Sequence, residues 1–75
     1  MTSRDAVRNH VRRCRRERDW TQQELADSVG VTRQTIVSIE GGRYNPSVGL
    51  ALRIAEQFGL AVETLFEIDR EQTDE

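Results

Sequence analysis

An arginine and a glutamine stand side by side at Arg33 and Gln34, within a stretch whose apolar residues have helical spacing. Arginine can donate two hydrogen bonds to O6 and N7 of guanine, and glutamine can donate and accept at N6 and N7 of adenine. Outside a suitable framework, such a pair would be only two exposed polar residues on a helix. The secondary structure around the pair therefore decides which of these two interpretations applies.

Other chemistry has little support in this sequence. His10 and Cys14 are four residues apart, a spacing that brings two side chains together on a helix, but the chain has one histidine and one cysteine, whereas structural zinc takes four ligands. Cys14 is better explained as a small core residue. No nucleophile, base and orienting group occur as a set, and Gly41-Gly42 lacks the lysine of a phosphate-binding loop. We expect no enzyme activity, no metal and no cofactor.

The segment before the Arg-Gln pair carries the signals of a short helix over residues 22–29. Thr21 can cap its start, and Glu24, three positions on, can bond back to the Thr21 amide, which is the capping-box pattern. Trp20 and Leu25 occupy the positions of a hydrophobic staple across this cap.

The same signals return after a glycine turn. Gly30 can take the left-handed conformation that closes the first helix. Thr32 can cap a second helix over residues 32–40, which Gly41-Gly42 ends. Two short helices joined by so tight a turn cross at a sharp angle, which is the helix-turn-helix motif. The Arg-Gln pair then lies in the first turn of its second helix.

Apolar residues at helical spacing predict three more helices, over about Asp5–Arg18, Ser47–Phe58 and Val62–Phe66. The apolar stripe of the first of these would consist of Val7, Val11 and Cys14. We expect an all-α fold, a compact five-helix bundle over residues 1–68. An acidic, disordered tail would follow over residues 69–75, with fraying from Ile68 onward.

Charge is unevenly distributed along the chain. The 75 residues carry a net charge of −2, yet residues 1–18 hold seven arginines against two acids, and residues 67–75 hold five acids against one arginine.

No apolar run approaches the roughly 20 residues of a membrane span, and a single cysteine excludes a disulfide framework. We expect a cytoplasmic single domain. A partner subunit would stabilise it, because a chain this small buries only about 60% of its surface.

The run from Trp20 to Ser47, W-T-Q-Q-E-L-A-D-S-V-G-V-T-R-Q-T-I-V-S-I-E-G-G-R-Y-N-P-S, resembles the phage-repressor/Cro-like (XRE) helix-turn-helix family of transcriptional regulators. The resemblance covers about residues 9–68 and implies a lambda-repressor-like DNA-binding domain of the short stand-alone type. Two positions depart from the family pattern. Gly41 stands where many relatives have asparagine, so a side-chain phosphate contact is lost there, and Leu50 replaces an acid of the fourth helix.

The resemblance also implies roles for individual residues. The second helix of the motif would lie in the major groove with its N-terminal residues on base edges. Thr35 adds a methyl and a hydroxyl group that could contact a thymine or a phosphate. The expected DNA-binding residues are Gln22, Thr32, Arg33, Gln34, Thr35, Ser38 and Arg43, of which Gln22 and Arg43 would contact phosphate. Arg15 and Glu40 match a family ion pair, and one or two further N-terminal arginines would reach DNA.

A monomer that contacts only a few base pairs could not select one site among about 10⁶ or more competitors. We therefore expect a homodimer that places two copies of the recognition helix in successive major grooves, about 34–36 Å apart. The expected interface consists of Leu65, Phe66 and Ile68. Repression is the expected outcome on double-stranded DNA. The alternative function is a protein-binding module, such as an antitoxin, whose protein partner would hold the acidic tail or the fifth helix.

Overall fold

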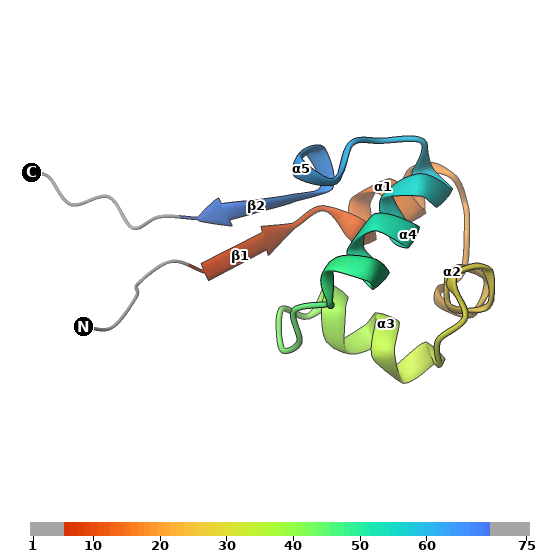
Figure 1. Ribbon diagram of the computed structural model, residues 1–75. Coiled ribbons are helices and arrows are strands. Elements are labelled where there is room, and N and C mark those ends of the chain that lie inside the picture. The colour runs from red at the N-terminus through yellow and green to blue at the C-terminus, as the bar shows by residue number, and fades with distance from the viewer. Residues whose placement is uncertain (1–5, 70–75) are drawn as a thin grey trace, which may run out of the picture.

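A computed structural model describes residues 6–69 of the chain. Within that range, five short helices pack into a bundle, and a two-stranded antiparallel ribbon joins the two ends of the described chain (Figure 1). The elements in chain order are β1 (Ala6–Asn9), α1 (Val11–Glu17), α2 (Gln22–Val29), α3 (Arg33–Glu40), α4 (Val48–Phe58), α5 (Val62–Leu65) and β2 (Phe66–Asp69). No helix in this range is long and apolar enough to cross a membrane.

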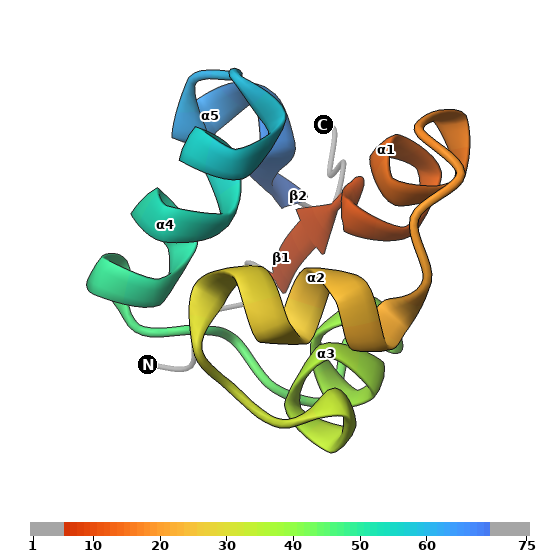
Figure 2. The same ribbon diagram turned by 90° about the vertical axis from the view of Figure 1, so that its right-hand side faces the viewer.

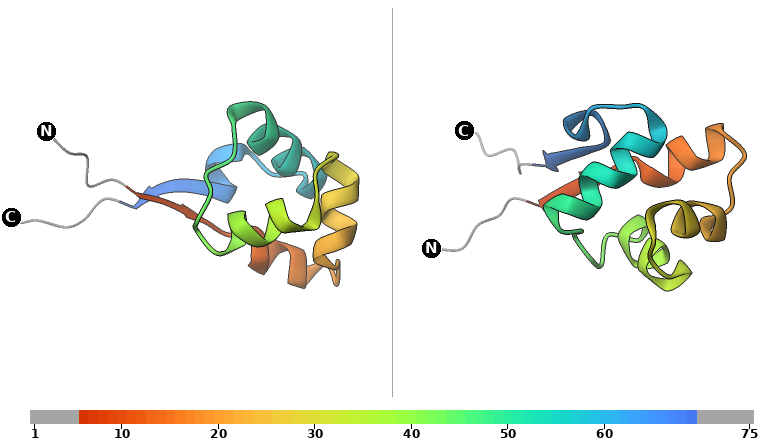
Figure 3. Two further views of the ribbon diagram at one scale, coloured as in Figure 1. Left: turned by 90° about the horizontal axis from the view of Figure 1, so that it is seen from below. Right: turned by 45° about the vertical axis from the view of Figure 1, so that its right-hand side comes forward.

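The ribbon corrects the predicted all-α fold. Residues 6–9 were expected in the first helix and Ile68 in a frayed end, but β1 pairs with β2, with Val7 opposite Ile68. The helix begins only at Val11, whose amide donates to the Asn9 side chain at 3.1 Å. The backbone N–H and C=O groups of β1 thus bond to β2, which is remote in sequence. The local spacing of apolar residues cannot reveal such pairing. Figure 3 shows the ribbon projecting from the helices. Residues 70–75 of the predicted tail lie outside the described range.

The helix-turn-helix forms as predicted. The Thr21 hydroxyl accepts from the Glu24 amide at 2.9 Å, and the Glu24 carboxylate accepts from the Thr21 amide at 2.8 Å, which completes the capping box. Gly30 closes α2 with φ of 78°, in the left-handed region. Thr32 then caps α3 by accepting from the Thr35 amide at 3.3 Å. Figure 2 shows α2 lying across α3.

The remaining helices also begin and end close to their predicted bounds. Ser47 caps α4 by accepting from the Leu50 amide at 3.1 Å, and Gly59 ends it in the left-handed conformation. The short α5 starts after Ala61 without a side-chain cap and covers a single turn. These ends are local features, so their positions follow from the sequence.

The core lies where the five helices meet. The largest side chains that are completely buried are Val11, Leu25, Ile36, Ile39, Ile54 and Leu65. Trp20 stacks on Phe58 with the ring centroids 5.2 Å apart, and Arg18 covers the Phe58 ring and donates to its carbonyl oxygen at 2.8 Å. This aromatic contact, which the sequence did not predict, ties the turn between α1 and α2 to the end of α4. The start of the motif is therefore joined to α4 by side-chain contacts.

Candidate DNA-binding surface

The first two turns of α3 present a shallow hollow to solvent. We call it the α3 hollow, and its lining residues are Thr32, Gln34, Thr35, Ser38 and Tyr44. The Thr32 and Thr35 hydroxyl oxygens are 3.0 Å apart, and the Gln34 amide lies 3.4 Å from the Ser38 hydroxyl. Four predicted site residues are thus brought together as a set of donors and acceptors. Tyr44 was missed, because a single aromatic residue in a loop gives no periodic signal.

Arg33 lines a second depression on the other side of the start of α3. We call it the α1–α2 groove, and it is lined by Arg12, Arg15, Arg16, Trp20, Thr21, Gln22, Gln23 and Arg33. The neighbouring residues Arg33 and Gln34 therefore border different depressions, although both are exposed. Because α3 begins between the two, a duplex seated on its first turn would meet both side chains.

Gln22 lies at the first position of α2, as predicted, but its side chain has a structural partner. The amide nitrogen donates to a carboxylate oxygen of Glu40 at 3.2 Å. An amide carries two N–H groups, so one is left for another acceptor. The first amides of a helix also lack partners within the helix and attract anions. Gln22 thus links the start of α2 to the end of α3 at the edge of the groove.

The predicted pair of Arg15 and Glu40 is confirmed. The Arg15 guanidinium donates to both carboxylate oxygens, at 2.7 Å from Nε and 3.1 Å from Nη2, and its Nη1 donates to the Trp20 carbonyl at 2.8 Å. The Glu40 side chain has no exposed surface. Burial alone raises the pKa of Glu40, but the hydrogen bonds from Arg15 and Gln22 and the Arg15 charge outweigh it, so the pKa lies below its ordinary value.

The last predicted contact residue, Arg43, follows α3 in an exposed loop. Its backbone amide donates to the Ser38 carbonyl at 3.0 Å, which fixes the chain beside the α3 hollow.

The two residues considered as metal ligands, His10 and Cys14, have other roles in the structure. The His10 ring lies 2.6 Å from the Glu67 carboxylate, and Cys14 is buried in the core.

Two short helices joined by a three-residue turn, with an exposed first turn of donors and acceptors beside an arginine-lined groove, define the helix-turn-helix class of DNA-binding domains. The helix-turn-helix family model matches residues 11–65. The chain belongs to this family, in its phage-repressor/Cro-like (XRE) branch. It is a DNA-binding regulator by class and not an enzyme.

Similar proteins agree with this assignment. A protein of Methanothermobacter thermautotrophicus named as an HTH-type transcriptional regulator is 48% identical over 66 residues, covering 87% of this chain and 96% of its own. The immunity repressor of Bacillus phage phi105 is 32% identical over 59 residues, covering 79% of this chain and 41% of the repressor. The crystal structure of the restriction-modification controller C.AhdI from Aeromonas hydrophila has a TM-score of 0.68 at 24% identity, covering 72% of this chain and 82% of that one. That structure supports the fold.

Proposed function

We propose that this protein is a sequence-specific transcriptional repressor that inserts α3 into the major groove of double-stranded DNA. The observation that carries the proposal is the α3 hollow, which is lined by four polar residues from the cap and the first two turns of α3, two of them exposed and two partly exposed. A major groove about 12 Å wide admits a helix presented in this way. A bound repressor would block access of polymerase to the site. The cytoplasm is the proposed location of such a protein.

The proposed contacts divide between bases and backbone. Gln34 would bond an adenine edge, with Thr35 and Ser38 on neighbouring bases, and Arg33 would bond a guanine. Thr32 is fully explained as the α3 cap, and a DNA contact would be additional. Gln22, at the start of α2, and Arg43, just after the end of α3, would bind phosphates, which would fix the register of the protein on the duplex.

A homodimer is part of the proposal, because two half-sites supply the selectivity that one lacks. The interface predicted from the sequence needs correction. Leu65 is completely buried, whereas the partly buried Phe66 and the exposed Ile68 line a surface hollow together with Val7. A buried core residue cannot be the anchor of an interface without unfolding its own domain.

We place the interface on α4 instead. Val48 and Leu52 lie one turn apart on this helix and are 77% and 52% exposed. Beside Leu52 a mainly apolar groove continues over Leu60 and Val62. Because α4 follows α3 after a short loop, a contact at its start would hold two α3 helices at a fixed separation. The exposed pair Val7 and Ile68 lies on the projecting ribbon and remains the second candidate surface.

The rival function, a protein-binding module, has no comparable support in residues 6–69. It was based on the acidic tail, of which residues 70–75 lie outside the described range, and on α5, a single turn whose Leu65 is buried. It is therefore kept as an outcome of the test.

The test is selection of binding sites from random duplexes by the wild type and by an Arg33→Ala, Gln34→Ala double variant. We expect the wild type to enrich a two-fold symmetric site and the double variant to lose the preference at the bases that these residues contact, at about 1–3 kcal/mol for each bidentate pair. The variant should keep the wild-type unfolding curve, since both side chains are exposed. If the folded wild type enriches no site, the repressor proposal is wrong and a search for a protein partner follows.

A further inference from the structure

The arginines near the N-terminus are not equivalent, and three of them are already used within the fold. Arg8 pairs with Asp69 at 2.8 Å. Arg15 is held by Glu40, and Arg18 donates to the carbonyl oxygens of Cys14 and Phe58. These contacts leave three exposed arginines on α1, namely Arg12, Arg13 and Arg16.

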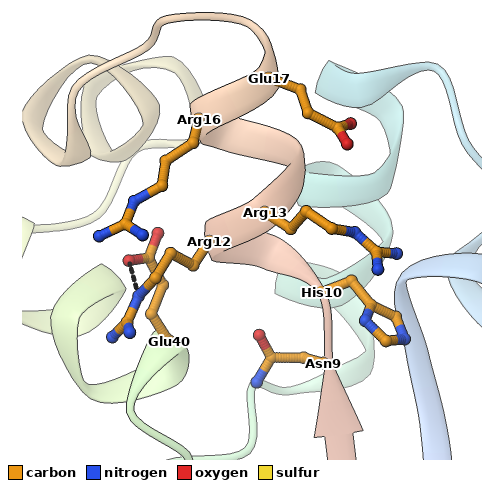
Figure 4. Close-up of a pocket in the computed structure, with 7 residues that line it drawn as sticks. All are labelled: Asn9, His10, Arg12, Arg13, Arg16, Glu17 and Glu40. Atoms are coloured by element: carbon orange, nitrogen blue, oxygen red, sulfur yellow. Dashed lines mark hydrogen bonds and ion pairs between the residues drawn. The ribbon is translucent and has the colours of Figure 1, made fainter.

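Two of these three face the DNA-binding surface. Arg12 and Arg16 lie one helical turn apart and line the α1–α2 groove together with Arg33, whereas Arg13 does not line it. Figure 4 shows the Arg12 and Arg16 side chains on one side of α1 and Arg13 turned to the other side, toward His10. The lining of the groove thus includes residues of α1 and the first residue of α3.

The electrostatics of this groove favour an anion. Among the described residues no carboxylate lines it, while four arginines do. The Glu40 side chain, which accepts from Gln22 of the groove lining, has no exposed surface and is bound by Arg15. Arg12 makes only a long contact to Glu40, with 3.5 Å between Nε and Oε1, and half of its side chain is exposed. Arg12 is thus paired with Glu40 on one side, and the exposed half of its side chain can still contact a ligand in the groove.

We propose that Arg12 and Arg16 bind backbone phosphates of the same duplex whose major groove receives α3. This rests on the proposed function, because the position of α3 brings one DNA strand along the groove. Two arginines one turn apart present two separate donor groups, so they would contact phosphates flanking the half-site. They would add affinity at every sequence, whereas the α3 hollow would distinguish sequences.

The test compares the salt dependence of DNA binding for Arg12→Ala, Arg16→Ala, the double variant and Arg13→Ala. Each lost phosphate contact makes the slope of log K against log salt shallower by about 0.9, so the double variant should lose about 1.8. Arg13→Ala removes the same charge from the same helix and should leave the slope unchanged. A double Arg12→Lys, Arg16→Lys variant should keep most of the wild-type slope, since lysine retains the charge.

Binding is measured by fluorescence anisotropy on the selected site and on an unrelated duplex of equal length. A double variant with the wild-type slope, or an Arg13→Ala variant as impaired as the other two, overturns the inference. If the wild type shows no sequence preference but the double variant still loses slope on both duplexes, the repressor proposal fails while the phosphate contacts stand. If the wild type binds neither duplex, both are wrong.

Discussion

The Arg15 guanidinium binds both carboxylate oxygens of Glu40, so one buried ion pair ties α1 to the last residue of α3. Gln22 adds a bond to the same carboxylate from the start of α2. Three helices therefore meet at a single side chain. The hollow proposed to contact the bases lies at the first two turns of α3, and Glu40 is its last residue. The orientation of the hollow therefore depends on a contact at the opposite end of the helix.

Removing one partner of this pair should be costly. We expect Arg15→Leu to destabilise the fold by about 3–5 kcal/mol, because the Glu40 charge is then buried without its counter-ion. A double Arg15→Leu, Glu40→Leu variant should recover much of that loss, since no charge remains in the interior. Urea unfolding followed by circular dichroism measures both. A double variant no more stable than Arg15→Leu would contradict this account.

Acid should weaken the fold through Glu40. Its pKa is lowered in the folded protein from an ordinary 4.5, so its stabilising effect is fully present above that value and is lost as the pH falls through the lowered folded value. A Glu40→Gln variant has no such titration. The difference in unfolding free energy between the wild type and this variant should therefore shrink as the pH falls below about 4.5. A constant difference down to acid pH would show that the Glu40 charge adds nothing.

Two helix caps offer a matched comparison of stability with DNA binding. Thr32 caps α3 and Ser47 caps α4 through the same type of bond to the third residue. Replacement of either by alanine should cost about 1 kcal/mol of stability. Thr32 lines the α3 hollow and Ser47 does not, so only Thr32→Ala should also weaken binding to the selected site. Thermal unfolding and anisotropy titrations together separate the two effects, and equal affinities of the two variants would leave Thr32 with a structural role only.

The proposed dimer interface can be tested with two single charges. Leu52→Asp on α4 should give a folded monomer by analytical ultracentrifugation and should lose affinity for a two-fold symmetric site. Ile68→Asp on β2 carries the same change at an equally exposed position, 53% against 52%, and should remain dimeric. The reverse result would move the interface to the ribbon.

The Trp20–Phe58 stack predicts a spectroscopic change. Phe58→Leu keeps an apolar side chain in the core but removes the aromatic partner, which contributes about 0.5–1.5 kcal/mol beyond the buried area. The fluorescence of Trp20, the only tryptophan, should shift to longer wavelength as the ring gains contact with water. Unchanged emission would mean that Trp20 is protected by other neighbours.

Features determined by neighbouring residues could be predicted from the sequence, and contacts between distant residues could not. The Thr21 and Thr32 caps depend on three or four consecutive positions, so α2 and α3 have the expected bounds. The pairing of Val7 with Ile68 joins opposite ends of the chain and left no periodic signal. The Arg15–Glu40 pair is equally remote, and it was predicted only through the family resemblance.

The candidate site shows the same division. Four of the five residues that line the α3 hollow were predicted, because they lie in α3 or at its cap, but the sequence could not tell which arginines have partners within the fold. That distinction depends on partners such as Asp69 and the Phe58 carbonyl, which only the fold brings near. For the same reason Leu65 was expected at an interface, although it is a core residue.

The ribbon also has a consequence for the topology of the domain. Ala6 lies opposite Asp69, so the first and last residues of the described chain are neighbours in space. A short peptide that joined these two points would restrict the unfolded chain far more than the folded one, so a circular form should melt at a higher temperature.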